Sequence, residues 1–116
     1  MKRNVNLFIK DILENINLIE DSLHKVKDSE FKQNRLLTDA TLRRLEIIGE
    51  AVKNIPLQFK EKYLRVPWRT IAGFRDVLTH TYFGVSLERV LEIIRRDLPE
   101  LKKEIVKIQN VLLRKP

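Results

Sequence analysis

The sequence predicts an all-α fold, and three observations lead to this prediction. The chain of 116 residues contains only three glycines and four prolines. Its apolar residues recur at spacings of three and four, and no segment alternates polar with apolar residues. Its length is that of one compact domain. We therefore expect a single domain over residues 1–116, built as an up-down antiparallel bundle of four to five helices.

The N-terminal half carries two long amphipathic patterns. The first predicts a helix over about residues 4–27, with one apolar stripe made of Val5, Phe8, Ile12, Ile16, Ile19, Leu23 and Val26. The segment "DSEFKQN" then breaks the pattern. A second helix is predicted over residues 35–54, where Pro56 stops it. Residues 57–66 form at most a short helix or a loop.

The C-terminal half is predicted to hold two further helical stretches. Pro67 suits the first turn of a helix, because its missing N–H is not needed there. Gly84 is placed to end that helix in a left-handed conformation, and Ser86 to cap the next one. From Leu87 an apolar stripe continues to the C-terminus. Pro99 interrupts it, so we expect a kink or two consecutive helices meeting near residues 97–99.

Composition limits the classes of function. The 23 lysines and arginines against 16 acidic residues give a net charge of +7 and favour an anionic partner such as nucleic acid, although a basic surface also serves solubility alone. The chain has no cysteine and only two histidines, His24 and His80, without ligand-like spacing. We therefore expect no metal and no cofactor. No apolar run reaches the length of a membrane span and the N-terminus lacks a signal-peptide pattern, which predicts a cytoplasmic protein.

The stretch "FRDVLTHTYFG" at residues 74–84 gathers the residues best suited to chemistry. On an ideal helix Asp76 and His80 lie one turn apart and can touch, whereas Arg75 and His80 differ by about 140°. If Arg75 and His80 act on one substrate, either the helix loosens near His80 or a second protomer contributes its own copy of the motif.

These residue types suit one reaction class. His80 can accept or give a proton near neutral pH, Asp76 can orient its ring, and Arg75 offers a permanent charge that fits phosphate oxygens. Together they suit the attack of an RNA 2′-hydroxyl on its own phosphodiester without a metal.

The same residues also have structural interpretations. A single histidine near a helix end is more often a cap or a packed residue, and Arg75 with Asp76 can form an ordinary surface pair. Tyr82 is by default an aromatic residue at the rim of the core. His24 we interpret as structural.

The pattern Arg75, four residues, His80, one residue, Tyr82 resembles the R-x4-H-x-Y motif of the HepT-like toxins in the HEPN superfamily. The blocks "LRRLEIIGEAVKNI" (42–55), "VPWRTIAGFRDVLTHTYFGVSLERV" (66–90) and "RRDLPELKKEI" also resemble that family in the same order. The resemblance covers about residues 36–106. Ser86 departs from the family, in which an acidic residue is commoner.

The resemblance implies a HEPN-type helical bundle that forms a homodimer, with the two motifs lining a shared cleft. It implies a metal-independent endoribonuclease in which Arg75 and His80 are the essential pair and Asp76 belongs to the site. It further implies that Tyr82 accepts AMP from a minimal nucleotidyltransferase (MntA-like) antitoxin, and that the unmodified toxin acts on RNA.

Two other features of the sequence leave alternatives open. Glu46 and Glu50 lie one turn apart around Gly49, and we interpret them as a polar contact to the motif helix or to a partner chain; a solvated acidic edge is the alternative. For the whole chain, a non-catalytic adaptor for a nucleotidyltransferase is the main competing function. Plain nucleic-acid binding through the basic surface is a third.

Overall fold

The computed structural model describes residues 4–74, 76, 78 and 86–114. These residues form helices and turns and include no strand, which confirms the all-α prediction for the described part of the chain. The helices are, in chain order, α1 (Val5–Leu23), α2 (Asp28–Gln33), α3 (Arg35–Asn54), α4 (Leu57–Lys60), α5 (Trp68–Ala72), α7 (Leu87–Glu92), the π-helical turn η1 (Ile93–Asp97) and α8 (Leu98–Arg114).

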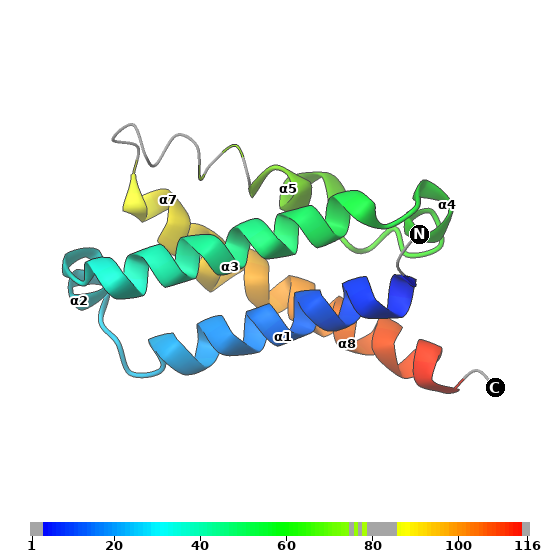
Figure 1. The fold of residues 1–116 in the computed structure, drawn as a ribbon, viewed down its shortest axis with the longest axis horizontal. Coiled ribbons are helices and arrows are strands. Elements are labelled where there is room, and N and C mark those ends of the chain that lie inside the picture. Colours follow the sequence, from blue (N-terminus) through cyan, green and yellow to red (C-terminus); the bar gives the residue numbers. More distant parts are fainter. Residues whose placement is uncertain (1–3, 75, 77, 79–85, 115–116) are drawn as a thin grey trace.

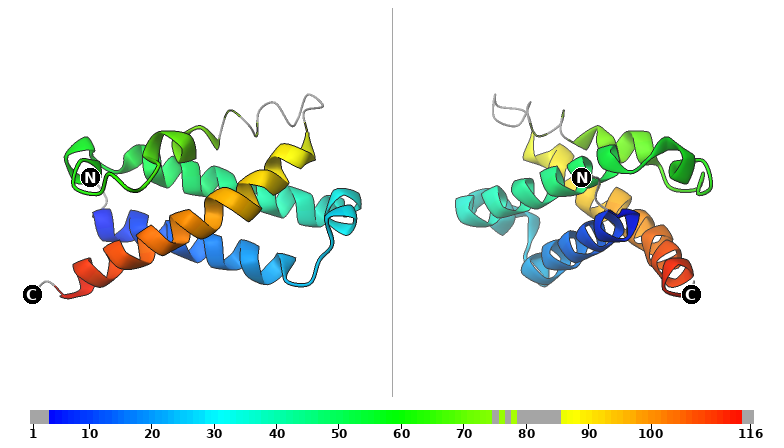
Figure 2. Two further views of the ribbon diagram at one scale, coloured as in Figure 1. Left: turned by 180° about the vertical axis from the view of Figure 1, so that it is seen from behind. Right: turned by 45° about the vertical axis from the view of Figure 1, so that its right-hand side comes forward.

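The long helices lie side by side along an elongated body that measures 47 × 27 × 26 Å (Figure 1). α1 and α3 run in opposite directions, α5 lies along α3, and the continuous stretch α7–η1–α8 returns behind them (Figures 1 and 2). α7–η1–α8 runs in the same direction as α3, and the short helix α5 between them in the chain runs the opposite way, so among the described long helices only α1 is antiparallel to the other two (Figures 1 and 2).

The core lies between α1, α3 and α8. In α1 the residues Ile12, Ile16 and Ile19 are fully buried at spacings of four and three, which confirms the stripe predicted for this helix. Complete burial of one such side chain contributes about 1.5–3 kcal/mol. The facing helices contribute a matching set of buried side chains: Leu45, Ile48 and Val52 from α3, and Leu98, Leu101, Ile105 and Ile108 from α8.

The first helix ends four residues earlier than its apolar pattern predicted. His24 leaves the helical conformation with ψ of 123°, and Lys25 has a left-handed φ of 63°. The chain has to turn here so that α2 and α3 can return along α1. Leu23 and Val26 still pack against the core, which explains why the apolar pattern continued past the end of the helix.

The segment "DSEFKQN", predicted only as a break, contains the short helix α2. Asp28 and Glu30 lie in its first turn, where carboxylates interact favourably with the helix dipole. Phe31 is buried, and its carbonyl accepts a hydrogen bond of 2.8 Å from Thr38 Oγ1 of α3. Six residues are too few to show a helical period, so tertiary packing rather than pattern reveals this helix.

The helix predicted from Pro67 onward is divided. Pro67 precedes α5 as its N-cap, one position earlier than expected, and its carbonyl accepts a hydrogen bond from Ile71 N–H. α5 ends at Ala72 and Gly73 forms a turn, after which Phe74 and Leu78 are again helical. The short helix α4 lies within residues 57–66, as predicted.

Two consecutive helical segments meet where Pro99 predicted a junction. The Leu98 N–H donates to Ile93 O, five residues earlier, which is the π-helical pattern. Pro99 has no N–H to donate, so an α-helical ladder would be interrupted at this place. The wider turn lets the chain pass into α8 without leaving a helical conformation.

Ion pairs between helices join the ends of the bundle. Lys102 Nζ of α8 lies 2.6 Å from Glu20 Oε1 of α1. Arg95 of η1 pairs with Asp28, and Glu88 of α7 pairs with Lys32, so two pairs hold α2 against the C-terminal stretch. Each pair is solvent-exposed and contributes at most about 1 kcal/mol. Among the described helices, none is long and apolar enough to cross a membrane.

Candidate functional site

Of the four residues predicted to form the site, the structure describes Asp76. Its side chain is exposed, and its N–H donates a hydrogen bond of 3.0 Å to Gly73 O. Arg75, His80 and Tyr82 lie outside the described residues. The same is true of Gly84, so its predicted role in ending the motif helix stays a prediction.

The start of the motif segment is fixed by apolar packing. Ile71, Phe74 and Leu78 follow one another at spacings of three and four and are 0%, 1% and 5% exposed. This spacing puts their side chains on one helical face, which is directed into the core. Asp76 is two residues from Phe74 and from Leu78, a rotation of about 200°, and so lies on the opposite, solvent-facing side.

The start of the motif segment packs against Gly49 of α3. A Cβ atom at Gly49 would lie 3.5 Å from Ile71 O and 3.9 Å from both Ala72 O and Phe74 Cβ. The backbone at the start of the motif segment therefore approaches α3 closely at Gly49.

The two glutamates beside Gly49 have different surroundings. Glu46 Oε1 accepts a hydrogen bond of 3.0 Å from Arg43 Nη1, one turn away on the same helix. Glu50 lines a pocket of about 180 Å³ between α1 and α3, together with Arg43 and with Phe8 and Asp11 of α1. The contact predicted for Glu46, with the motif helix or a partner chain, stays a prediction.

The chain after the motif is held by a capped helix. Ser86 Oγ accepts a hydrogen bond of 3.2 Å from Arg89 N–H, which confirms the predicted N-cap of α7. Val90 and Leu91 of α7 are buried in the core. Described residues on both sides of the motif thus connect it to the bundle, Phe74 before it and Ser86 after it.

The electrostatics of the described residues offer few other candidates for chemistry. Partial burial lowers the pKa of the Lys60 ammonium at the end of α4, because removal from water disfavours its charged form. Within the described ranges no three histidines, cysteines or acidic residues lie close enough together to hold a metal ion.

Comparison with known proteins gives the family. Residues 12–108 match the family described as "Ribonuclease HepT-like". The chain belongs to the HepT-like ribonuclease family. The matched range covers most of the bundle, from within α1 to within α8, and includes the whole of the R-x4-H-x-Y motif.

Curated HepT-like relatives extend the similarity over nearly the whole chain. It is 44% identical to a Methanocaldococcus jannaschii protein named "Gamma-glutamylcyclotransferase and putative RNase", over 97% of this chain and 50% of that protein. It is 42% identical to a "Putative RNase" of Caldanaerobacter subterraneus, over 87% of this chain and 90% of that one. It is 39% identical to the "Probable ribonuclease HepT" of Thermococcus cleftensis, over 95% and 100% respectively.

The chain thus spans about half the length of the Methanocaldococcus relative and most or all of the other two. No solved structure matches it.

Residues 61–66 of this HepT-like chain lie in a segment for which the sequence predicted at most a short helix or a loop. In the structure residues 62–66 form one wall of a pocket of about 320 Å³, whose other wall is α8. The signal available in the sequence was "KYLR", a tyrosine with a cation on either side in a connecting segment.

Proposed function

We propose that this HepT-like chain is a metal-independent endoribonuclease and the toxin of a toxin–antitoxin pair. The observation that carries the proposal is the complete R-x4-H-x-Y motif at residues 75–82 within the range that matches the HepT-like ribonuclease family. The relatives named as ribonucleases and the net charge of +7 support an RNA substrate.

In the proposed reaction the RNA supplies its own nucleophile. The imidazole of His80 takes the proton of a ribose 2′-hydroxyl, and the 2′-oxygen attacks the adjacent phosphorus. The bond from phosphorus to the 5′-oxygen breaks, the departing oxygen receives a proton, and a 2′,3′-cyclic phosphate remains. DNA resists this reaction because it lacks the 2′-hydroxyl.

Arg75 stabilises the transition state of this reaction, and Asp76 orients the ring of His80. The guanidinium of Arg75 binds the phosphate oxygens, whose negative charge increases in the transition state. Asp76, exposed one turn before His80 in the sequence, holds the histidine ring in the productive tautomer. The site is composite: two chains form a homodimer, and their motifs line one cleft.

The proposed control of this activity acts on Tyr82. A minimal nucleotidyltransferase (MntA-like) antitoxin transfers AMP from ATP to the tyrosine hydroxyl, forming an O–P bond and releasing pyrophosphate. The added phosphate places negative charge two residues from His80, occupies the binding place of the RNA phosphate and repels RNA.

Cleavage of total cellular RNA in the presence of EDTA tests the proposal. We expect cleavage by the wild type and a loss of at least about 100-fold in His80→Ala and in Arg75→Ala, because each variant loses proton transfer or charge stabilisation. Circular dichroism and thermal unfolding of both variants serve as the control for folding. Intact mass after incubation with the nucleotidyltransferase and ATP reports AMP transfer, and Tyr82→Phe is expected to abolish it.

The adaptor function predicts a different set of results. An adaptor binds the nucleotidyltransferase equally well with or without His80 and leaves RNA intact when unmodified. Absence of cleavage by folded, unmodified protein on total RNA would overturn the ribonuclease proposal in favour of this alternative.

A further inference from the structure

A second polar and aromatic cluster, made of residues outside the motif, lines the pocket between the α4–α5 connection and α8. The volume of this pocket is about 320 Å³, at the small end of the range of about 300–1,000 Å³ that is typical of small-ligand sites. The lining residues are Lys62, Tyr63, Leu64, Arg65, Val66, Glu104, Lys107, Ile108 and Val111. A pocket of this size suits one nucleotide-sized group rather than the broad face of a protein.

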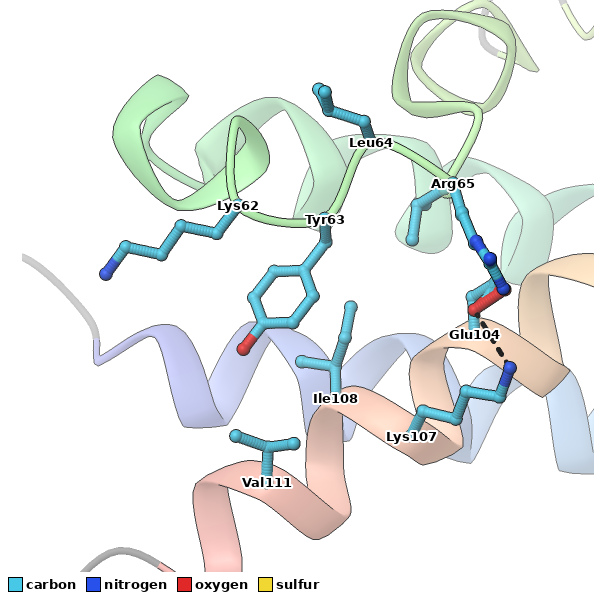
Figure 3. A pocket seen from close by; sticks show the side chains of 9 residues that line it. Lys62, Tyr63, Leu64, Arg65, Glu104, Lys107, Ile108 and Val111 are labelled. Carbon is cyan, nitrogen blue, oxygen red and sulfur yellow. Dashed lines mark ion pairs between the residues drawn. The ribbon is translucent and has the colours of Figure 1, made fainter.

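The pocket combines an aromatic ring with an aliphatic floor. Tyr63 reaches from the connection toward α8, where Ile108 and Val111 lie opposite it (Figure 3). Phe59 packs against the tyrosine ring, with the ring centroids 5.0 Å apart. An aromatic ring supported on one side and lining an open pocket is the arrangement on which an unpaired base stacks.

The charges of the pocket are mainly positive. Lys62, Arg65 and Lys107 contribute three cations, and Glu104 contributes one carboxylate. Glu104 Oε2 lies 3.7 Å from Lys107 Nζ on the same helix, and the side chain of Arg65 is directed toward the same carboxylate in Figure 3. Three cations against one carboxylate at an apolar pocket favour an anionic ligand with a flat hydrophobic part.

Hydrogen bonds within the chain itself hold the wall of the pocket in place. Trp68 Nε1 donates to Tyr63 O at 3.0 Å and lies 3.2 Å from Lys60 O. The Val66 N–H also donates to Tyr63 O, at 3.2 Å, and the Val66 side chain is buried. The wall is thus formed before binding, so little conformational entropy is lost when a ligand enters.

The geometry points to a binding site for one unpaired nucleotide of the RNA substrate in this pocket, with the base against Tyr63 and the phosphates at Lys62 and Arg65. The inference rests on the proposed ribonuclease function and adds a second contact with the same RNA. The wall continues directly into α5, and Arg75 follows Val66 by nine residues in the chain. RNA held here extends the contact surface beyond the motif.

Binding of a fluorescently labelled, unstructured RNA oligonucleotide, measured by anisotropy, tests this site. The His80→Ala variant serves as background, so that the RNA is not cut during titration. Lys62→Glu/Arg65→Glu is expected to weaken binding by at least about ten-fold and to lower the salt slope by about 1.4, the value for two phosphate contacts on a single strand. Tyr63→Leu keeps an apolar side chain but removes the ring, and is expected to weaken binding by at least about five-fold.

Arg35→Glu is the control for charge reversal outside the pocket, and it reverses one cation where the pocket variant reverses two. Arg35 starts α3, at the end of the molecule away from the pocket, is exposed and has no ion pair among the described residues. A carboxylate in the first turn of a helix is favourable for stability, so the control changes charge without damaging the fold. Thermal unfolding of each variant confirms that it is folded.

The outcomes separate this inference from the proposed ribonuclease activity. Pocket variants that bind RNA as tightly as Arg35→Glu, or a parent protein that does not bind RNA, would overturn the nucleotide site. Weakened binding in the pocket variants supports it, even where the wild type cleaves no RNA and the ribonuclease proposal fails. Cleavage by the wild type with unchanged binding in the pocket variants would leave the ribonuclease and remove the site.

Discussion

At the scale of single residues, Gly49 sets the distance between α3 and the start of the motif segment. A methyl group at this position would lie 3.5 Å from Ile71 O, which is ordinary van der Waals contact. We therefore expect Gly49→Ala to fold normally and to gain up to about 1 kcal/mol of unfolding free energy, because alanine has the higher helix propensity. Urea unfolding followed by circular dichroism measures this change.

A side chain larger than alanine at position 49 would clash with the backbone of the motif segment, because a Cβ atom there is already in van der Waals contact with it. Gly49→Leu is expected to lower the free energy of unfolding by about 1–3 kcal/mol, since it pushes the backbone at Ile71 and Ala72 away from α3. The same displacement moves Phe74, next to Arg75, so RNA cleavage is expected to fall more than stability. Equal stability of the alanine and leucine variants would show that the contact is looser than the distances indicate.

The residue types of the sequence were enough to predict which residues are candidates for the site. The contacts that residues make in the folded chain were not predictable in this way. Arg75, His80 and Tyr82 stand out in the sequence because few side chains bind phosphate or transfer protons near neutral pH. The pairing of Glu46 with Arg43 on its own helix was not predicted, because a surface carboxylate has several cations within reach. The pocket at Tyr63 was not predicted because it joins residues 62–66 to α8, which are distant in the sequence, so no local pattern indicates it.

At the scale of elements, Ser86 determines where the C-terminal helical stretch begins. Its hydroxyl accepts the Arg89 N–H, one of the N–H groups that a helix start leaves without a partner. We expect Ser86→Ala to lower the free energy of unfolding by about 1 kcal/mol and Ser86→Asp to retain it, because a carboxylate also accepts this hydrogen bond. Denaturant midpoints of the three proteins measure the difference, and equal midpoints for serine and alanine would contradict the role of the cap.

Helices were predicted accurately where sequence signals and packing agree. α3 has the predicted bounds, 35–54, because Asn34 caps its start by accepting from Leu37 N–H and Pro56 prevents its continuation. Where the sequence pattern and the tertiary packing differ, the packing determines where a helix forms and where it ends. α1 stops before Lys25 although Val26 still contacts the core, and α2 forms because Phe31 is buried. The π-helical turn before Pro99 depends on matching two packed helices, which the local sequence does not encode.

At the scale of the whole molecule, the proposed chemistry requires Arg75 and His80 to reach one phosphate. On an ideal helix the two side chains point about 140° apart, so a single regular helix does not bring both to one substrate. A homodimer solves this problem when Arg75 of one chain and His80 of the other contribute to the same site. Because a two-fold axis relates the chains, such a dimer has two equivalent pairs.

Mixing two inactive variants tests this arrangement. In a heterodimer of Arg75→Ala and His80→Ala, one pair loses both residues while the other keeps an intact arginine and an intact histidine. We expect co-expressed, doubly tagged heterodimers to recover up to about half of the wild-type cleavage rate, since one of two equivalent sites is restored. Each homodimeric variant, purified in the same way, is the inactive control. Heterodimers as inactive as both controls would mean that each site takes its arginine and histidine from a single chain, and the helix would then have to loosen near His80.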